Sequence, residues 1–377
     1  DIGKKNALFI HLTLVPYLKA SDEIKTKPTQ YSVKELRSIG VQPDIIICRS
    51  ERPIPLEHRK KISLFCNVDI KNVIETVDVK TIYEAPMSFF SEKLDIQVLN
   101  YFKLKSKKPV NLKPWKKITK IILQNKKQVN IAIIGKYVEL KDAYKSLDEA
   151  LTHGGIDNNI KVNLERIDSE KLKVSEIKKK LKNISGILIP GGFGKRGTDG
   201  KIEAIKHARI NKIPFLGICY GMQMAIIEFA RNKLNLKKAT SSEFDKKGIP
   251  IIGLIDEWKK NGKIIKGTDK NLGGTMRLGL YDAKLKHNSL IKKIYGKNLI
   301  KERHRHRYEV NINYKEKFEK NGMIFSGLSP DGILPEIIEL KNHPWFIGVQ
   351  YHPEFKSRPL APHPLFSSFI KASKNHK

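Results

Sequence analysis

One cysteine occupies a position suited to a nucleophile. Cys219 lies in IPFLGICYGMQ, residues 213–223, after a short apolar run, with Gly217 and Gly221 on either side. The run predicts a buried strand and the residues after it have helical spacing, so Cys219 falls on a sharp turn that needs small neighbours. The start of the following helix would favour the thiolate. A buried structural cysteine is the alternative, but the glycines favour a nucleophile.

A thiolate nucleophile needs a general base, and the segment GVQYHPEF offers one. It contains His352 and Glu354, 133 residues after the cysteine in the case of the histidine. In an extended segment, side chains two residues apart point the same way, so the carboxylate could orient the imidazole. A surface turn would have the same letters. The motif therefore gains its weight only in combination with Cys219.

A glycine-rich segment follows another predicted strand. ILIPGGFGKRG, residues 187–197, is typical of a loop that turns backbone N–H groups towards an anion or a developing oxyanion. A dinucleotide-binding loop is the competing interpretation, but the G-x-G-x-x-G spacing is absent. We therefore favour the oxyanion role.

Two polar segments could contact ligands. In ERHRHRYEVN, three arginines alternate with His304 and His306, a pattern that mostly fits a solvated strand face. One arginine could grip a carboxylate in bidentate fashion, whereas a metal site lacks a suitably spaced Cys or acidic partner. In EIKTKPTQYS, residues 23–32, a plain polar loop competes with a cradle. In the cradle, the two lysines would contact phosphates and the glutamine would read the edge of a base.

The predicted elements fall into two blocks joined by a lysine-rich segment. Residues 1–105 contain NALFIHLTLV and PDIIICRS, which we interpret as buried strands, with a helical pattern between them that ends at Gly40. Residues 106–128 predict a linker with one amphipathic helix. Residues 129–377 begin with alternating strand and helix patterns, which predict an open, mostly parallel sheet with helices on both faces.

Bulk composition excludes several classes of protein. The 377 residues suit two domains, and the net charge is +33, but only 13 of the 72 basic residues are Arg. Lysine is spread along the chain without a nucleic-acid-binding motif, so we expect a solvated surface and no nucleic-acid partner. Three cysteines are too few for a disulfide scaffold and fit a cytoplasmic setting. No apolar run is long enough to span a membrane.

Taken in order, PGGFGKRG, GICYGMQ and HPEF resemble the class I glutamine amidotransferases. Further segments are similar to the CTP synthase family: HLTLVPY, KTKPTQ, CRSERPIP, KISLFCNV, DAYKS, GGTMRLG and NHPWF. The resemblance implies an α/β chain. A partial P-loop-like synthetase domain (1–105) and the linker would be followed by a flavodoxin-like amidotransferase domain (129–377). It also implies ATP-dependent amination of UTP to CTP with ammonia from glutamine.

The resemblance also assigns site residues by matching position. Cys219, His352 and Glu354 would form the catalytic triad. The residues expected to hold glutamine, including the oxyanion donors, are Gly192, Tyr220, Gly221, Met222, Gln223, Glu243 and Arg307. Those expected at the site shared by UTP and inhibitory CTP are Lys25, Thr26, Lys27, Pro28, Thr29, Gln30 and Lys61. Val77, Asp78 and Val79 would contact ATP, and the DAYKS region is implicated in activation by GTP.

Two departures from the family pattern qualify these expectations. Tyr220 stands where the family usually has leucine, which puts the wall of the glutamine pocket in doubt. The P-loop-like segment and acidic Mg²⁺ ligands that open the family's synthetase domain are not in the sequence. We therefore expect that the amino-terminal part of that domain is missing, that no metal ligand lies in this chain, and that the chain alone is limited to glutaminase activity. With the full domain, the family pattern implies a homotetramer.

Two other classes of function stay open at this point. The first is a different glutamine amidotransferase or a glutaminase-only subunit, against which KTKPTQ and KISLFCNV argue. The second is a non-catalytic homologue, such as a filament-forming scaffold or a basic nucleic-acid binder. The intact set of Cys219, His352 and Glu354 argues against this second class.

Overall fold

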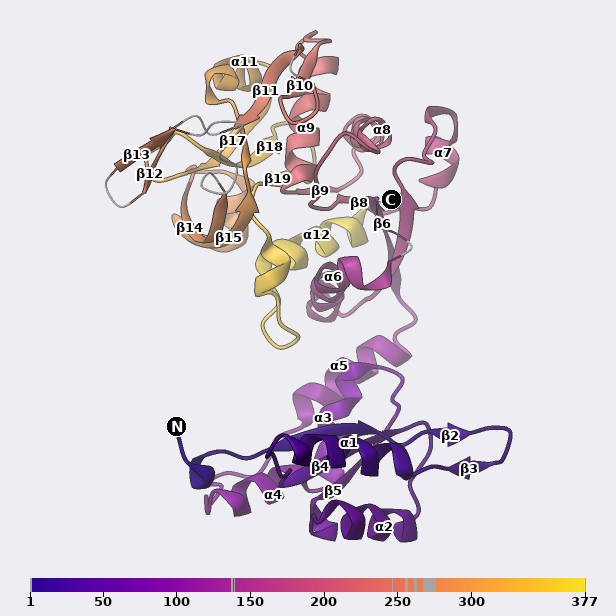
Figure 1. Cartoon of the computed structure of the whole chain (residues 1–377). Helices are drawn as coiled ribbons and strands as arrows, with labels where there is room; N and C mark the ends of the chain where they lie inside the picture. Colours follow the sequence, from indigo (N-terminus) through magenta and orange to yellow (C-terminus); the bar gives the residue numbers. More distant parts are fainter. Residues whose placement is uncertain are drawn as a thin grey trace. The chain divides into compact units, whose positions relative to one another are not determined.

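The computed structural model describes residues 2–136, 138, 140–245, 247–254, 257–260, 263–266 and 276–376. Contacts divide the chain into two compact units, Asp1–Gln124 and Asn125–Lys377 (Figure 1). Each unit is described by itself.

The first unit is built on a parallel sheet with the strand order β1-β4-β5. Its strands are β1 (Ile10–Leu14), β4 (Ile45–Ser50) and β5 (Val73–Val77), with a small hairpin of β2 (Tyr17–Leu18) and β3 (Glu23–Ile24). The helices are α1 (Lys27–Ser38), α2 (Leu56–Cys66), α3 (Ala85–Ser91), α4 (Leu94–Tyr101) and α5 (Lys113–Gln124). The predicted strand–helix–strand unit is therefore confirmed as β1–α1–β4, and β4–α2–β5 repeats it.

Only one of the two strands predicted as buried in this unit is buried. Strand β4 is covered on both faces, and Ile45, Ile46 and Cys48 are inaccessible to solvent or nearly so. Strand β1 was wrongly predicted, because Leu12 and Leu14 are 65% and 56% exposed. On that face, residues of α3 and α4 pack over β4 and β5, while β1 lies at the edge of the sheet.

The lysine-rich segment contains a helix that packs on the first unit. Helix α5 buries Ile118 and Ile121, and Trp115 near its start stacks on Tyr83 with 6.5 Å between ring centroids. The amphipathic helix expected within residues 106–128 therefore exists, and its apolar face belongs to the core of the first unit.

The second unit contains an open sheet of nine strands, in the order β15-β14-β17-β18-β19-β9-β8-β6-β7. The parallel half consists of β6 (Gln128–Gly135), β7 (Lys161–Asp168), β8 (Gly186–Ile189), β9 (Phe215–Ile218) and β19 (Phe346–Val349). Numbered along the chain, these five strands have the order 2-1-3-4-5, which is the flavodoxin-like arrangement. The expected parallel sheet is confirmed.

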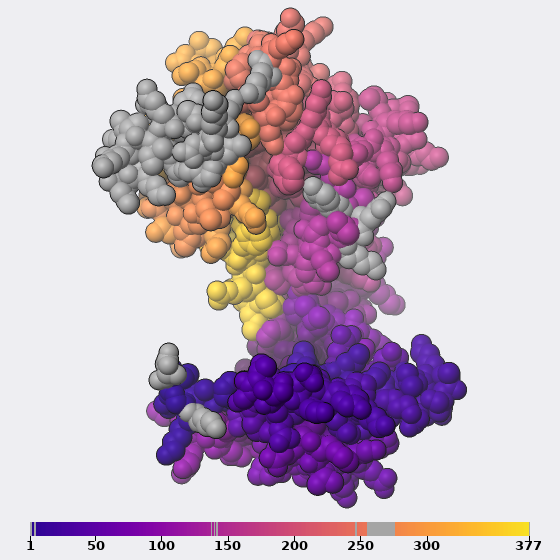
Figure 2. Space-filling model, in the orientation of Figure 1, coloured from indigo at the N-terminus to yellow at the C-terminus, as the bar shows by residue number. Residues whose placement is uncertain are grey.

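Helices cover both faces of the parallel half. Alternate residues of β6 face opposite sides: Ala132 and Ile134 join one core and Ile131 and Ile133 the other. The first core includes α8 (Thr198–Ile210) and α9 (Tyr220–Asn232). The second includes α6 (Lys145–Asp157) and α12 (Pro364–Asn375), which contact each other (Figure 2). A short helix, α7 (Ile177–Lys180), precedes β8.

The antiparallel half extends the sheet beyond β19. It consists of β14 (Arg277–Leu285), β15 (Leu299–His306), β17 (Met323–Leu328) and β18 (Pro335–Leu340). Outside it lie β10 (Ala239–Ser241), β11 (Ile249–Leu254), β12 (Glu257–Lys260), β13 (Lys263–Lys266), β16 (Tyr308–Val310), α10 (Leu290–Tyr295) and α11 (Lys315–Lys320). In the described parts of the chain, no helix is long and apolar enough to cross a membrane.

Candidate active site

The predicted nucleophile turn is present. Cys219 links β9 to α9 with φ of 51° and ψ of −102°, a backbone conformation that is strained for a residue with a side chain. The two glycines allow the turn to close. A Cβ on Gly217 would lie 2.8 Å from the Gly221 carbonyl, and a Cβ on Gly221 would overlap the carbonyl oxygen of Ile189. The sequence interpretation of both glycines is therefore confirmed in physical terms.

The histidine and glutamate of the predicted triad lie in contact. His352 Nδ1 and Glu354 Oε1 are 2.7 Å apart, and the two side chains are 13% and 11% exposed. The main-chain N–H of His352 donates to the carbonyl of Arg303 on β15, which fixes the start of the turn. The residues are held in register by a 3-10 turn, η7 (Pro353–Lys356), and not by a continuous extended strand.

The electrostatics of this site favour a protonated imidazole. Burial alone would lower the pKa of His352, but hydrogen bonds and charge interactions with Cys219 and Glu354 outweigh burial and raise that pKa to about 10. An imidazolium beside a sulfur atom stabilises a thiolate. The side-chain amide of Gln350 lies 3.7 Å from Cys219 Sγ, at which it is aimed as a donor. The arrangement suits nucleophilic attack on a carbonyl carbon.

The glycine-rich loop lies where an oxyanion would form. Gly191 approaches the catalytic imidazole, since a Cβ there would lie 2.8 Å from His352 Cε1. Gly192 lies beside the Tyr220 ring, at which a Cβ would be 3.9 Å from Cδ1. The predicted loop and the start of α9 are therefore brought together. Their N–H groups become candidate oxyanion donors.

Glu243 is also brought to this loop. Its Oε1 accepts a hydrogen bond of 2.7 Å from the N–H of Gly194. Burial raises the pKa of the Glu243 carboxyl, against the opposing effects of the Gly194 N–H and the charge of Lys136. A half-buried carboxylate in this position has the charge needed to bind a substrate ammonium group.

The remaining residues predicted to hold glutamine differ in their surroundings. Met222 is fully buried in the core between the sheet and α9, so its side chain supports packing. Gln223 donates from Nε2 to the carbonyl of Tyr308 at 2.9 Å, which ties the first turn of α9 to β16. Arg307 is half-buried in the link between β15 and β16, directly before that carbonyl.

The histidines of ERHRHRYEVN do not lie on a solvated face. His304 and His306 are 3% and 7% exposed, and their rings are hydrogen-bonded, with Nδ1 of the first 2.9 Å from Nε2 of the second. Burial and the charge of Arg277 lower the pKa of both histidines. Alternation along β15 directs the intervening arginines outward. Among the described residues, no group of three or more His, Cys, Asp or Glu could hold a metal ion.

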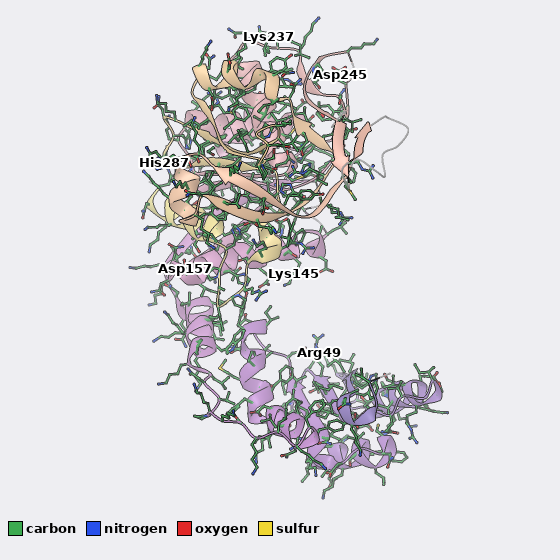
Figure 3. The ribbon with its side chains drawn as sticks, turned by 90° about the vertical axis from the view of Figure 1, so that its left-hand side faces the viewer. Arg49, Lys145, Asp157, Lys237, Asp245 and His287 are labelled. Carbon is green, nitrogen blue, oxygen red and sulfur yellow. The ribbon has the colours of Figure 1, made fainter. Side chains whose placement is uncertain are left out.

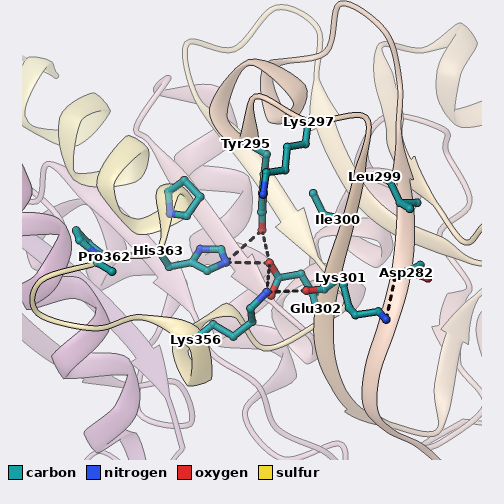
Figure 4. Close-up of a pocket in the computed structure, with 12 residues that line it drawn as sticks. Asp282, Tyr295, Lys297, Leu299, Ile300, Lys301, Glu302, Lys356, Pro362 and His363 are labelled. Carbon is teal, nitrogen blue, oxygen red and sulfur yellow. Dashed lines mark hydrogen bonds and ion pairs between the residues drawn. The ribbon is translucent and has the colours of Figure 1, made fainter.

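A buried polar cluster supports the catalytic turn from behind (Figure 4). Glu302 is 1% exposed and accepts at Oε1 from Tyr295 Oη at 3.2 Å and from His363 Nε2 at 3.0 Å. Lys356, at the end of η7, donates to the carbonyl of Lys301 and pairs with Glu302 at 3.3 Å. The cluster lines a cavity of about 470 Å³. Its lysine anchors the turn that carries Glu354.

The DAYKS segment lies beside the triad. A hollow of about 210 Å³ is lined by Asp142, Ala143, Tyr144, Ser146, Arg305, His352, Glu354 and Phe355, among others. Phe355 is 53% exposed and stacks on the His352 ring. A ligand in this hollow would contact the back of the catalytic histidine and glutamate.

In the first unit, the predicted UTP and CTP residues gather near the start of α1, after β1. The expected polar loop is the first turn of this helix, with Thr26 at its N-cap position. Thr29 is buried and donates to the carbonyl of Leu14, and Gln30 donates to Thr26 Oγ1 at 3.1 Å. Lys25 pairs with Glu23, whose carboxylate also interacts electrostatically with Lys61 on α2. Helix starts and nearby lysines suit phosphate binding.

The predicted ATP residues follow β5, at the carboxyl edge of the same sheet. Asp78 forms an exposed ion pair with Arg49 (Figure 3), with Nε and Oδ1 2.7 Å apart. Val79 is 40% exposed and, with Asp78 and Lys80, borders a hollow of about 450 Å³. Ligands of open parallel sheets bind at this carboxyl edge.

Gln350 and Lys136 were not predicted from the sequence as site residues. Gln350 belongs to the same motif as His352, so its proximity to the triad was a readable signal. Lys136 follows the apolar strand β6, and its ammonium donates to the carbonyl of Phe193 in the oxyanion loop. Only the fold brings those two residues together.

Comparison with known proteins places this geometry in a class. Residues 139–372 match the family model of glutamine amidotransferase class-I. The solved glutaminase domain of Trypanosoma brucei CTPS with bound acivicin is 36% identical, with a TM-score of 0.59 over 66% of this chain and 95% of that one. With its Cys219 elbow and its His352–Glu354 pair, the chain is a class I glutamine amidotransferase.

Relatives narrow the class further. Residues 1–104 match the model of the CTP synthase N-terminus. A CTP synthase of Pelagibacter ubique is 90% identical over the whole chain and 70% of its own length, and one of Zymomonas mobilis is 54% identical over 99% and 69%. The chain belongs to the CTP synthase family. The expectation that the amino-terminal part of the synthetase domain is missing is not borne out, since the N-terminal model itself matches.

Proposed function

We propose that this protein is a glutamine-dependent CTP synthase, which aminates UTP at the expense of ATP, and that Cys219 releases the ammonia. The Cys219 elbow facing the His352–Glu354 pair carries the proposal. Membership of the CTP synthase family supports the nucleotide half of the reaction. A glutaminase-only subunit would not need the segment 25–30, which presents lysines and a helix start suited to phosphates.

The glutaminase step uses the residues of the second unit. The Cys219 thiolate attacks the side-chain amide carbon of glutamine, and the N–H groups of Gly192 and Tyr220 stabilise the oxyanion. The carbon–nitrogen bond breaks as His352 gives its proton to the departing ammonia. Water, deprotonated by the same imidazole, then attacks the thioester, which releases glutamate and restores the thiolate. Glu243 would hold the substrate ammonium and Arg307 its carboxylate.

The synthetase step uses the residues of the first unit. Lys25, Lys27 and Lys61 would bind the phosphates of UTP or of inhibitory CTP, and Val77–Val79 would border ATP. Transfer of the γ-phosphoryl group to O4 of UTP creates a leaving group, which ammonia displaces to give CTP, ADP and phosphate. Bound Mg²⁺ would neutralise phosphate charge in such a step. The described residues offer no three-ligand group for it, so we assign no residue to the metal.

Regulation and assembly follow the family pattern in this proposal. GTP would activate by binding in the hollow between the DAYKS segment and Phe355, from which it would contact His352 and Glu354. We further propose a homotetramer in the cytoplasm. Sedimentation of the chain with and without UTP and ATP measures the first of these, and a persistent monomer with both nucleotides would contradict it.

A labelling experiment tests the central proposal. A glutamine-analogue electrophile is expected to alkylate Cys219, with Cys48 and Cys66 left unmodified because both thiols are fully buried. Excess glutamine should block the labelling. Ammonia release and CTP formation are then measured on the same preparation with UTP, ATP and glutamine. Labelling that glutamine does not affect, or that falls on the other cysteines, would contradict a glutaminase site and favour a non-catalytic homologue.

Replacing Gly191 with alanine should disturb the catalytic imidazole alone. The new Cβ would lie 2.8 Å from His352 Cε1, so the ring must move. A displacement of the order of 1 Å can lower kcat about 10²-fold. Steady-state glutamine hydrolysis measures the effect. Gly253→Ala is the matched control, because its Cβ would meet Ser242 Oγ at 3.8 Å without strain. Equal activities in the two variants would refute the proposed contact.

Replacing Glu354 with glutamine should lower both the pKa of His352 and the rate. The carboxylate stabilises the imidazolium, so without it the pKa should fall from about 10 towards 6.5. By analogy with other triads, kcat should fall about 10²- to 10⁴-fold. The pKa is measured by NMR titration of the imidazole, with the exposed Glu165→Gln as control. An unchanged titration would exclude this role for Glu354.

The same shift predicts a pH dependence of stability. The folded pKa of His352, about 10, lies above the ordinary value of 6.5. Protonation of this histidine therefore contributes stability that is complete below pH 6.5 and is lost as the pH rises through 10. In Glu354→Gln this loss should shift to lower pH, which urea unfolding across that range would detect.

A further inference from the structure

Tyr220 reaches from the nucleophile turn to the oxyanion loop. Its side chain is 1% exposed, and its hydroxyl donates to the carbonyl of Gly194 at 2.5 Å. The ring lies between two ammonium groups, with Lys136 Nζ at 5.9 Å and Lys201 Nζ at 5.6 Å from its centroid. Lys201 is itself 2% exposed and donates to Ser169 Oγ at 3.0 Å. Ring and hydroxyl therefore have defined positions.

The loop that Tyr220 meets is fixed through its main chain. The N–H of Gly194 donates to Glu243, its carbonyl accepts from Tyr220, and the carbonyl of Phe193 accepts from Lys136. Gly194 has φ of 72°, a left-handed conformation that leaves these groups pointing in different directions. Phe193 itself is 66% exposed and contributes little packing to the loop. Hydrogen bonds and not apolar burial hold this segment.

We propose that the hydroxyl of Tyr220 is a positioning group for the oxyanion hole. The proposal rests on the glutaminase function above. The main-chain N–H of Tyr220 is one candidate donor and that of Gly192 is the other, and the Cβ position of Gly192 is 3.9 Å from the Tyr220 ring. A single residue thus supplies one donor and braces the loop that carries the other. The hydroxyl keeps the separation of the two donors fixed.

The same hydrogen bond links the oxyanion loop to substrate binding. Glu243 and Tyr220 bond to opposite ends of one residue, Gly194, through its N–H and its carbonyl. Burial raises the pKa of Tyr220, so the hydroxyl retains its proton and remains a donor. A leucine in this position has no donor. The tyrosine therefore adds a contact that an apolar side chain of the same pocket cannot make.

Tyr220→Phe removes the hydroxyl and keeps the ring. We expect kcat for glutamine hydrolysis to fall about 10-fold, the size of effect produced by about 1.4 kcal/mol of transition-state stabilisation. Binding of glutamate γ-semialdehyde should weaken by the same factor, because its thiohemiacetal with Cys219 places an oxygen in the oxyanion hole. Alkylation of Cys219 by iodoacetamide, which forms no oxyanion, should be unchanged.

Tyr101→Phe is the matched control. Tyr101 also donates from its hydroxyl to a main-chain carbonyl, that of Ala7 at 2.7 Å, but in the first unit. It should leave glutamine hydrolysis and semialdehyde binding as in the unaltered chain.

Three outcomes separate the possibilities. Equal semialdehyde affinity in Tyr220→Phe and the unaltered chain overturns the positioning role. A matching loss of iodoacetamide reactivity also overturns it, because the hydroxyl would then act on the nucleophile itself. Absence of hydrolysis by the unaltered chain contradicts the proposed function instead, whatever the variant does.

Discussion

Cys219→Ala is expected to lower kcat for glutamine hydrolysis by at least about 10⁴-fold, because the variant retains the oxyanion loop and the imidazole but has no nucleophile. The fold should survive, since the alanine side chain fits within the space of the thiol and relieves no packing contact of another chain segment. The measurement is ammonia release at saturating glutamine. Cys66→Ala is the matched control: its thiol is fully buried in the first unit and should not affect this rate.

The same variant separates the two half-reactions. Supplied ammonium bypasses glutamine, so Cys219→Ala should form CTP from UTP, ATP and ammonium at the rate of the unaltered chain. Glutamine should support no CTP formation in the variant. Loss of the ammonium-dependent rate would mean that Cys219 also supports the synthetase step. Substantial hydrolysis of glutamine by the variant would exclude this cysteine as the nucleophile.

The triad was predictable because its signals are local. Cys219 and its two glycines lie within five residues, and the steric need for each glycine follows from the turn that joins a strand to a helix. His352 and Glu354 are also neighbours in sequence. Pairing the two motifs needed the resemblance to a family, because nothing local places residue 352 beside residue 219. The structure supplies that link through adjacent parallel strands, β9 and β19.

Partners that are distant in sequence escaped prediction. Lys136, Lys201 and Tyr220 meet around one ring, although they lie on β6, α8 and α9 or directly beside them. The alternating Arg and His residues of β15 gave the right period, but alternation alone does not tell which face is buried. Arginine on the outer face and histidine on the inner one is the reverse of a solvated strand, and a buried Arg277 explains why.

Arg277→Met is expected to lower the free energy of unfolding of the chain by about 3–5 kcal/mol near pH 8, since it leaves buried carboxylates without their cation. Arg277 is 3% exposed, with Nη1 2.9 Å from Glu309 Oε1 and Nη2 2.7 Å from Glu336 Oε1. Its guanidinium also lies over the Tyr281 ring at 4.6 Å. Methionine fills much of the same volume, so lost charge and not a cavity should dominate.

The pH dependence of this effect has a defined sign. Burial and the neighbouring Glu336 raise the pKa of Glu309 to about 8, although Arg277 opposes the shift. The folded chain therefore binds a proton that the unfolded chain releases above about pH 4.5, and stability falls as the pH rises between these values. Without Arg277 the carboxyl pKa values should rise further. The loss in Arg277→Met should thus be smaller at pH 5.5 than at pH 8.

Urea denaturation at the two pH values measures both claims. Arg49→Met is the matched control: its pair with Asp78 is 61% and 41% exposed, and such pairs contribute about 0–1 kcal/mol. The triple variant with Glu309→Gln and Glu336→Gln should recover much of the stability, because neutral amides need no counter-ion. Equal effects of Arg277→Met and Arg49→Met would contradict the charge argument. Recovery should also restore glutamine hydrolysis, since the main-chain N–H of Gln350, the residue aimed at Cys219, donates to the carbonyl of Glu336.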